Sequence, residues 1–153
     1  MPMKKQLFLL TIALLFGSAA IAQSGRVIGY WLTEDEDSQV EVFQKADNQY
    51  YGRIVWLDEP LNDEGKPKVD DKNPDKAMHQ TPIMGLDILK GFSYNASRNE
   101  WSGGTIYDPK NGKTYTAYMR LDGNNKLAIR GYVMGMRFLG RTTEWSREGG
   151  KRE

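Results

Sequence analysis

Cysteine is absent from this 153-residue chain, and histidine occurs only once, at position 79. The absence of cysteine excludes disulfides, thiolate metal sites and cysteine nucleophiles. Acidic and basic residues nearly balance, at 20 and 21, and this balance predicts no attraction to nucleic acid or to an anionic membrane. The sequence also has no Gly-x-Ser-x-Gly or similar nucleophile motif beside its histidine. We therefore expect a protein that is not an enzyme and that holds no cofactor.

Long apolar runs are missing except near the start of the chain. There Lys4 and Lys5 precede an apolar run over residues 7–16, and Ala20-Ile21-Ala22 follows it. The run is shorter than the ~20 residues that a membrane span needs. The pattern predicts a signal peptide over residues 1–22 and a single mature domain over residues 23–153. We expect that domain to be periplasmic or secreted and free of any lipid anchor, since no cysteine follows the cleavage site.

The rest of the chain alternates between short apolar segments and turns. The clearest strand is predicted over residues 50–57, where β-branched and aromatic residues fill a run too short for a typical helix. Further strands are expected over residues 25–33, 39–45, 85–94, 104–107, 114–121, 126–133 and 137–145. Eight antiparallel strands joined by tight turns predict an all-β barrel, because closure leaves no exposed sheet edge. The charged tail over residues 146–153 is expected to be frayed.

One connection, over residues 58–82, is much longer than the others and rich in acidic residues and proline. Its Asp71, Asn73 and Asp75 have the spacing of the first half of a calcium loop. However, Lys76 stands where that loop requires glycine, and Pro82 where it requires glutamate. We interpret the segment as a solvated loop and keep a calcium site as the less favoured alternative. Since connections this long are commonly functional or disordered, the loop is also a candidate binding surface.

Two smaller features have simple interpretations. The single histidine, His79, lies in a polar segment without a neighbouring nucleophile, so catalysis is not expected there. The sequence Met134-Gly135-Met136 offers two thioethers, which copper(I) accepts as ligands. More often such methionines fill gaps in apolar packing, and we favour that interpretation.

Candidate ligand-binding residues are the aromatic and arginine residues on the expected strands, because a small barrel can hold one ligand inside. An arginine that points inward needs an acidic partner, since an unpaired buried charge is costly. Alternation predicts that Arg120 and Arg130 point outward, and it leaves both faces open for Arg53 and Arg141. The candidate binding residues are Arg53, Trp56, Tyr107, Tyr115, Tyr132 and Arg141.

Several segments together resemble the secreted bacterial domain-of-unknown-function family 2147. They are Gly29-Tyr30-Trp31, residues 51–57, residues 70–75, residues 85–92, residues 101–109, Gly131-Tyr132-Val133, Gly140-Arg141-Thr142 and Trp145. The resemblance implies an eight-stranded antiparallel lipocalin-like β-barrel with one long loop, located outside the cytoplasm. It implies no settled activity and no agreed functional residues.

The pair Gly29-x-Trp31 also resembles the Gly-x-Trp signature of lipocalins proper. In that family the tryptophan closes one end of the barrel beside an arginine from near the last strand. The positional match here is Arg141, with Arg147 second. We interpret the pair as support for the fold, because an indole and a guanidinium contribute about 0.5–2 kcal/mol.

Two functions follow from these observations. The first is a non-enzymatic binder or carrier of a small apolar or amphipathic molecule inside the barrel. The alternative is a protein-interaction module of the cell envelope that has a filled barrel and binds a protein partner through the loop over residues 58–82. Neither includes nucleic acid or a membrane span.

Overall fold

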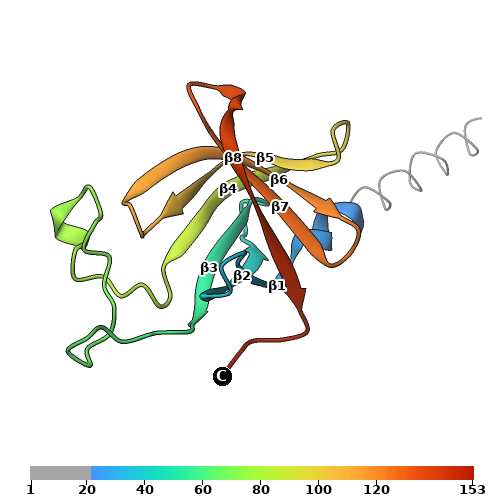
Figure 1. Cartoon of the computed structure of the whole chain (residues 1–153). Helices are drawn as coiled ribbons and strands as arrows, with labels where there is room; N and C mark the ends of the chain where they lie inside the picture. The colour runs from blue at the N-terminus through green and yellow to red at the C-terminus, as the bar shows by residue number, and fades with distance from the viewer. Residues whose placement is uncertain (1–21) are drawn as a thin grey trace, which may run out of the picture.

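The computed structural model describes residues 22–153, which form a closed antiparallel barrel of eight strands (Figure 1). The strands are β1 (Gly29–Leu32), β2 (Ser38–Gln44), β3 (Tyr50–Leu57), β4 (Asp87–Asn95), β5 (Glu100–Asp108), β6 (Lys113–Asp122), β7 (Lys126–Val133) and β8 (Met136–Glu148). Each strand pairs with the next along the chain, and β8 pairs with β1 to close the barrel. Two short 3-10 helices, η1 (Gly25–Val27) and η2 (Lys76–Met78), lie outside the sheet. Apart from its last residue, Ala22, the predicted signal peptide lies outside the described residues.

All eight expected strands are confirmed, and the bounds of β3 and β7 agree with the prediction. The first strand begins later than expected because η1 precedes it and the Ile28 amide hydrogen-bonds to the Gly25 carbonyl at 3.1 Å. The fifth begins earlier than expected, at Glu100. A register shift between Trp101 and Gly104 breaks its alternation, which hid its first half from a period-based prediction.

The expected fraying of the tail is wrong for most of it. Strand β8 extends to Glu148, because its last residues pair with β1. Beyond the strand, the Arg152 amide donates to Gln39 Oε1 at 3.0 Å, and Gln39 Nε2 donates to the Gly150 carbonyl at 2.9 Å. The buried Gln39 thus holds the C-terminal segment against β2.

Inward-facing residues follow the alternation that the sequence shows. Val40 and Val42 on β2 are fully buried, as are Leu127 and Ile129 on β7. This period of two explains why the apolar face of each strand could be assigned from sequence. In the described chain from residue 22 onward, no helix is long and apolar enough to cross a membrane.

One end of the barrel is packed shut by tryptophans. Trp31 and Trp101 are fully buried. Their indole nitrogens donate to the carbonyls of Val27 and Ser24, at 2.9 and 3.0 Å, so the segment around η1 covers this end. The role of Trp31 inferred from its Gly-x-Trp signature therefore agrees with its position.

The arginine beside Trp31 is Arg147, and the expectation that Arg141 takes this place is wrong. The Arg147 guanidinium lies 4.1 Å from the centre of the Trp31 ring, and Trp31 and Arg147 are partners in the β1–β8 ladder. Arg141 instead pairs with Gly131 in the β7–β8 ladder, nearer the opposite end of the barrel. Strand register decides which arginine meets the indole, and distance along the chain does not reveal it.

Candidate functional site: the open end of the barrel

The end of the barrel opposite Trp31, here called the mouth, contains a cavity of ≈ 430 Å³. Its apolar lining comes from several strands and includes Ile54, Ile88, Ile106, Ile129 and Trp145. Gly131 also lines it, and a Cβ added there would lie 3.3 Å from the Cβ of Tyr115. A larger residue at this inward position would fill the space, so the glycine helps to keep the cavity open.

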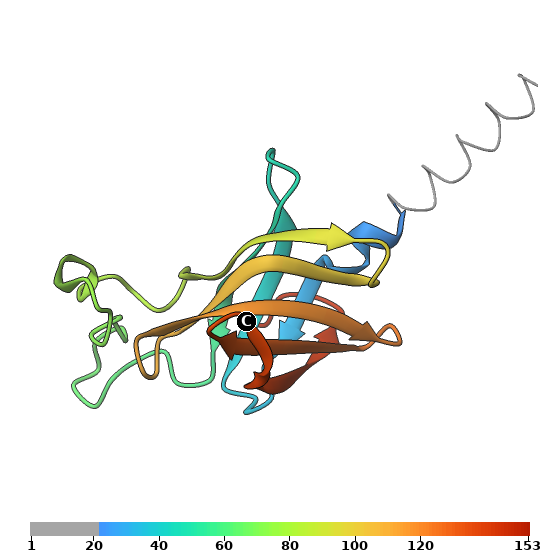
Figure 2. The same cartoon turned by 90° about the horizontal axis from the view of Figure 1, so that it is seen from above.

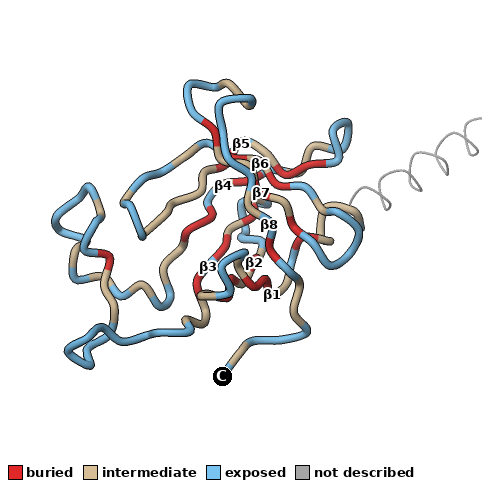
Figure 3. Tube along the Cα trace, viewed as in Figure 1, coloured by how far each residue is buried: buried red, intermediate tan, exposed pale blue. Residues whose placement is uncertain are grey.

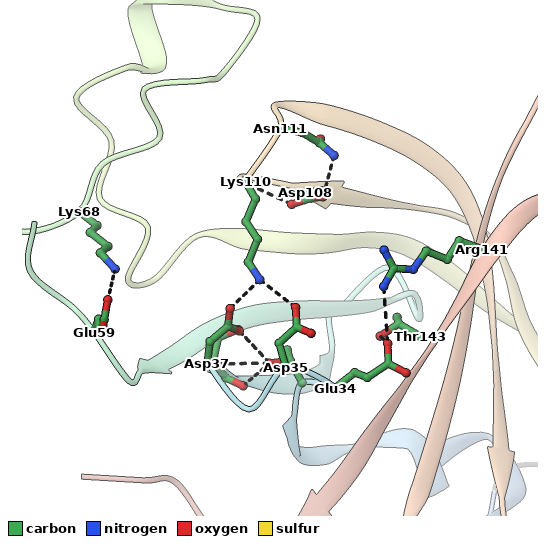
Figure 4. A network of polar contacts seen from close by, with 12 residues as sticks. Glu34, Asp35, Asp37, Glu59, Lys68, Asp108, Lys110, Asn111, Arg141 and Thr143 are labelled. Carbon is green, nitrogen blue, oxygen red and sulfur yellow. Dashed lines mark hydrogen bonds and ion pairs between the residues drawn. The ribbon is translucent and has the colours of Figure 1, made fainter.

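A lysine between two carboxylates forms part of the rim (Figure 4). Lys110 Nζ lies 2.6 Å from Asp37 Oδ2 and 3.0 Å from Asp35 Oδ2. It comes from the β5–β6 hairpin, and both acids come from the β1–β2 turn, so the contact joins opposite sides of the mouth. The hydroxyls of Thr33 and Ser38 each donate to Asp37 Oδ1 at 3.0 Å.

These contacts change the acidity of both partners. Burial acts to raise the pKa of Asp37, but hydrogen bonds from Lys110, Ser38 and Thr33 outweigh it and hold that pKa below its ordinary value. The hydrogen bond to Asp37, and then that to Asp35, raises the pKa of Lys110. Both groups therefore stay ionised at neutral pH and are already matched in charge.

Arg141 is the least engaged cation of the rim. Its side chain is 87% exposed, and its Nη2 atom lies 4.0 Å from Glu34 Oε2. That same oxygen accepts a hydrogen bond from Thr143 Oγ1 at 3.1 Å. Figure 4 shows the guanidinium pointing toward Thr143 of the same strand and Glu34 just beyond the end of the neighbouring β1. Arg141 can therefore turn to another acidic partner without leaving a buried charge unpaired.

Four of the predicted binding residues meet at this cavity: Tyr107, Tyr115, Tyr132 and Arg141 all line it. Tyr132 also contacts a residue of the outer face, since its ring packs on that of Tyr118 with 6.3 Å between centroids. Tyr107 also forms a hydrogen bond with the long loop, which is described below.

The other two predicted residues, Arg53 and Trp56, do not line the cavity. Arg53 Nε donates to Asp87 Oδ1 at 3.0 Å, and its guanidinium lies 5.1 Å from the centre of the Phe43 ring. The Trp56 indole donates to the carbonyl of Glu153 at 3.1 Å, and Arg152 lies over its ring. Arg53 lies between the buried Gly52 and Ile54, so alternation places its side chain outward. Trp56 is two residues beyond Ile54, but the β2–β3 register shifts there, since Val40 pairs with Ile54 and Gln39 with Trp56. This irregularity interrupts the alternation before Trp56.

Arg120 and Arg130 lie on the outer face, as alternation predicted. Arg120 Nη2 donates to Glu100 Oε2 at 2.9 Å, while Arg130 Nη1 donates to Thr142 Oγ1 at 3.0 Å.

The loop over residues 58–82 leaves the barrel at the mouth, on the same side as the β5–β6 hairpin (Figure 2). Most of its residues are exposed, but Asp70 is fully buried (Figure 3). Asp70 Oδ1 accepts a hydrogen bond from the Tyr107 hydroxyl at 2.6 Å, and its Oδ2 atom accepts one from Asn73 Nδ2 at 2.7 Å. The interpretation of the segment as simply solvated therefore fails at Asp70, which attaches the loop to β5.

A second contact holds the loop against the β5–β6 turn. Lys72 Nζ donates to the Lys110 carbonyl at 2.9 Å. At Gly112, which has a φ of +70°, a Cβ would lie 1.9 Å from the Lys72 carbonyl oxygen. Only glycine accommodates both this φ and this approach.

Between the loop and the mouth lies a second cavity of ≈ 550 Å³. It shares five lining residues with the first: Asp37, Ser38, Ile54, Pro109 and Lys110. The two cavities therefore adjoin, and the loop forms an outer wall beside the mouth.

The remaining sequence candidates have other roles. His79 Nε2 donates to the Asn73 carbonyl at 2.8 Å, within the loop. No three His, Asp or Glu side chains in the described part of the chain are grouped so that they could hold a metal ion. Met134 is 84% exposed, so it does not fill an internal gap as we had interpreted it.

Sequence reasoning missed Asp70 and Lys110 as parts of this end of the barrel. Each lies in a segment that reads as a turn or solvated loop, where charged residues are ordinary. Both act through partners far away in the sequence, so their spacing gave no signal.

Comparison with known proteins agrees with this architecture. Residues 29–147 match the family described as "Uncharacterized protein conserved in bacteria (DUF2147)". Among solved structures, the chain is similar to protein HP1028 from the human pathogen Helicobacter pylori, which is described as belonging to the lipocalin family. The TM-score is 0.68 at 22% identity, over 80% of this chain and 83% of that one. No curated protein matches the sequence. The chain is thus a lipocalin-like barrel and belongs to the DUF2147 family of bacterial proteins.

Proposed function

We propose that this protein is a non-enzymatic binder of a small amphipathic molecule, which it holds in the mouth of the barrel. The observation that supports this most directly is an apolar cavity with Arg141, a weakly paired cation, at its edge. Its volume of ≈ 430 Å³ lies within the range of about 300–1,000 Å³ that is usual for small-molecule sites. The isoleucine lining would bury the apolar part of the ligand.

The rim suggests which polar group the ligand has. Lys110 is already neutralised by two carboxylates, whereas Arg141 contacts Glu34 only at 4.0 Å. A guanidinium forms short, paired hydrogen bonds with carboxylate or phosphate groups. We therefore propose an anionic head group at Arg141 and an apolar body inside the cavity.

A matched pair of ligands and a matched pair of variants test this proposal. The mature protein is titrated with a fluorescent fatty acid and with the fatty alcohol of the same chain length. Arg141→Gln should weaken binding of the acid roughly tenfold, since a hydrogen bond to a charged group contributes about 1.5–3 kcal/mol. Binding of the alcohol should hardly change.

Arg53→Gln serves as the control, because Arg53 is also a strand cation but lies outside the cavity. Equal losses in the two variants would contradict a specific role for Arg141. Failure of the unaltered protein to bind either probe would argue against an amphipathic ligand of this kind.

We further propose that the protein acts outside the cytoplasm, in the periplasm or as a secreted protein. The support is the sequence itself: two lysines, an apolar run and a small-x-small site ending at Ala22. Intact-mass measurement of the protein from the cell envelope or medium should find a chain that begins at or near Gln23. A mass that includes residues 1–16 would contradict cleavage.

The alternative function, a protein-interaction module, is favoured by one observation on the long loop. Leu61 and Met78 are exposed there, at 51% and 37%. Replacement of residues 59–76 by a short Gly/Ser linker separates the two functions. If the loop is the binding surface, capture of a protein partner is lost while the fatty-acid probe still binds. If the mouth is the site, the probe binds both versions and neither captures a protein partner, since no residue of the loop lines the mouth cavity.

A further inference from the structure

Residues 133–139, here called the apolar arm, contain an unusual concentration of exposed hydrophobic side chains. Val133, Met134, Phe138 and Leu139 are 44%, 84%, 74% and 42% exposed. They make up half of the large exposed hydrophobic residues in the described part of the chain. Contiguous exposed apolar residues of this kind commonly mark an interaction surface.

The backbone holds the apolar arm away from the core. Val133 pairs with Met136, but Tyr132 pairs with Gly140, so three residues of β8 bulge out of the ladder. The turn itself uses positive φ angles of 55° at Met134 and 68° at Gly135. Arg130 Nη2 donates to the Phe138 carbonyl at 3.2 Å, which fixes the bulge over the outer face of β7. Figure 1 shows the β7–β8 hairpin projecting from the barrel at the top of the view.

Arginines surround a single buried carboxylate beside the apolar arm. Glu100 is fully buried, and its oxygens lie 2.6 Å from Arg137, 2.9 Å from Arg120 and 4.0 Å from Arg98. Only Arg137 belongs to the apolar arm itself. With Arg130, four guanidinium groups accompany one carboxylate, so this part of the outer face is positively charged. The near-neutral balance of the whole chain does not reveal such a local excess, because the fold creates it.

We propose that the apolar arm attaches this protein to the surface of an anionic lipid bilayer. Met134 and Phe138 would enter the headgroup region, while Arg98 and Arg120, whose side chains are 58% and 51% exposed, would lie beside lipid phosphates. Apolar side chains flanked by cations are the combination that holds peripheral proteins on such membranes.

The small extent of the apolar arm favours a bilayer over a protein partner. A stable protein interface recruits about 20–30 residues from each side and needs complementary shape. The apolar arm offers four exposed hydrophobic side chains on a projecting hairpin, and a bilayer requires no matching groove. Val133 and Leu139 also line the mouth cavity, so attachment would bring the mouth close to the membrane. The proposal does not depend on which ligand the cavity binds.

Vesicle cosedimentation tests the proposal. The mature protein is mixed with vesicles of phosphatidylcholine alone and with vesicles that also contain phosphatidylglycerol, at low and at high salt. We expect binding to the anionic vesicles, weakened by salt because Arg–phosphate attraction is screened. The double variant Met134→Ser/Phe138→Ser should lose roughly tenfold or more of this affinity, as it removes both side chains that enter the bilayer.

The control is Leu61→Ser/Met84→Ser, which removes two exposed apolar side chains from the region between β3 and β4 and should leave binding unchanged. Should the arm's double variant unfold, Met134→Ser alone tests the most exposed position. Three results would overturn the proposal: no vesicle binding by the unaltered protein, equal losses in both double variants, or equal binding to neutral and anionic vesicles. A dimer that disappears in the arm's double variant, without any vesicle binding, would instead assign the apolar arm to a second copy of the chain.

Discussion

The guanidinium of Arg147 lies 4.1 Å from the centre of the Trp31 ring, so an arginine of the last strand covers the tryptophan of the first strand. Arg147 also connects three neighbouring segments. Its Nε atom donates to the Asn124 carbonyl at 2.6 Å, its Nη1 atom to the Ile28 carbonyl at 3.0 Å, and its Nη2 atom to the Arg26 carbonyl. One side chain therefore joins the segment before β1, the β6–β7 turn and β8 at the closed end.

Substitution of this arginine should destabilise the fold, whereas substitution of Arg141 should not. Arg147→Ala removes the contact with the indole, worth about 0.5–2 kcal/mol, and leaves carbonyl groups without their donor at about 1–3 kcal/mol. Arg141→Ala should stay within about 0.5 kcal/mol of the unaltered protein, since its side chain is 87% exposed. Denaturant unfolding of the two variants measures both effects. Equal midpoints would show that the closed end does not depend on Arg147.

These two arginines also show how far the sequence alone could lead. The strands themselves were predictable, because burial on one face imposes a period of two that is visible in segments such as β7. From the Gly-x-Trp pair one could expect an arginine beside Trp31, but the choice between Arg141 and Arg147 depended on the β1–β8 register. That register arises from closure of the whole barrel and has no local signature.

The candidate site was predictable only in part, for the same reason. Tyr115 falls on the inward face of an alternating strand and was correctly expected inside the barrel. The contact between Asp70 and Tyr107 joins residues 37 positions apart, and no property of either neighbourhood marks it. Placement of Arg53 failed because it falls on the outward face between Gly52 and Ile54, and placement of Trp56 failed because a register shift between β2 and β3 interrupts the alternation before it.

Gly131→Val should block the mouth cavity. The new side chain would point toward Tyr115 and Ile106, whose nearest atoms lie 3.3 and 3.4 Å from the position that a Cβ would take. Those neighbours must give way slightly, so some stability will be lost, typically about 1–3 kcal/mol for an overpacked site. Affinity for the fluorescent fatty acid should fall roughly tenfold or more, because the added methyls occupy the space of the ligand.

Gly123→Ala is the matched control for that experiment, since Gly123 lies in an exposed turn with nothing within 4 Å of an added Cβ. Its φ of +65° strains any substitution, so it lowers stability without touching the cavity. If the affinity for the fluorescent fatty acid falls equally in both variants, the fall reflects weakened folding and not a filled cavity.

Acid should weaken the cluster around Glu100. Burial acts to raise the pKa of this carboxyl, but hydrogen bonds from Arg137 and Arg120 outweigh it and hold the pKa below its ordinary value of 4.5. A depressed pKa in the folded state means that the stabilisation is complete above pH 4.5 and is lost as the pH falls through the folded-state pKa. Melting temperatures recorded from neutral pH down to about pH 3 follow this loss.

Glu100→Gln should lower stability at neutral pH, because the three arginines beside it lose their carboxylate partner. It should also reduce the fall of the melting temperature as the pH decreases. The control is Glu144→Gln, whose carboxylate is 57% exposed and lies 3.8 Å from Lys126. Asp37, Asp47 and Glu148 also have lowered pKa values and will preserve part of the decline in every variant. An unchanged pH profile in Glu100→Gln would show that the cluster does not couple to folding.

The hydrogen bond from Tyr107 to Asp70 should control the order of the long loop. Tyr107→Phe removes the hydroxyl that lies 2.6 Å from the buried carboxylate, which then keeps only the Asn73 side chain among its side-chain donors. An unsatisfied buried acceptor costs about 1–3 kcal/mol. We expect faster amide hydrogen exchange over residues 58–82 and little change in β6 and β7, which pair with each other along most of their lengths. Tyr51→Phe is the control, because it removes a similar 2.7 Å hydrogen bond, to Asp47, from an exposed hairpin.

Alkali should release the same contact. Burial first, and then the hydrogen bond to Asp70, raises the pKa of Tyr107 from 10.0 to about 12. Because the folded state holds this proton more tightly than the unfolded chain, the stabilisation is complete below pH 10 and is lost as the pH rises toward 12. The hydrogen bond to Asp47 also raises the pKa of Tyr51, so ultraviolet difference spectra of tyrosinate formation should show more than one delayed tyrosine. The step near pH 12 should disappear in Tyr107→Phe and persist in Tyr51→Phe. If the late step survives in Tyr107→Phe, or if the loop exchanges no faster in that variant, then other contacts hold the loop at the mouth, and the linker that replaces residues 59–76 becomes the decisive comparison.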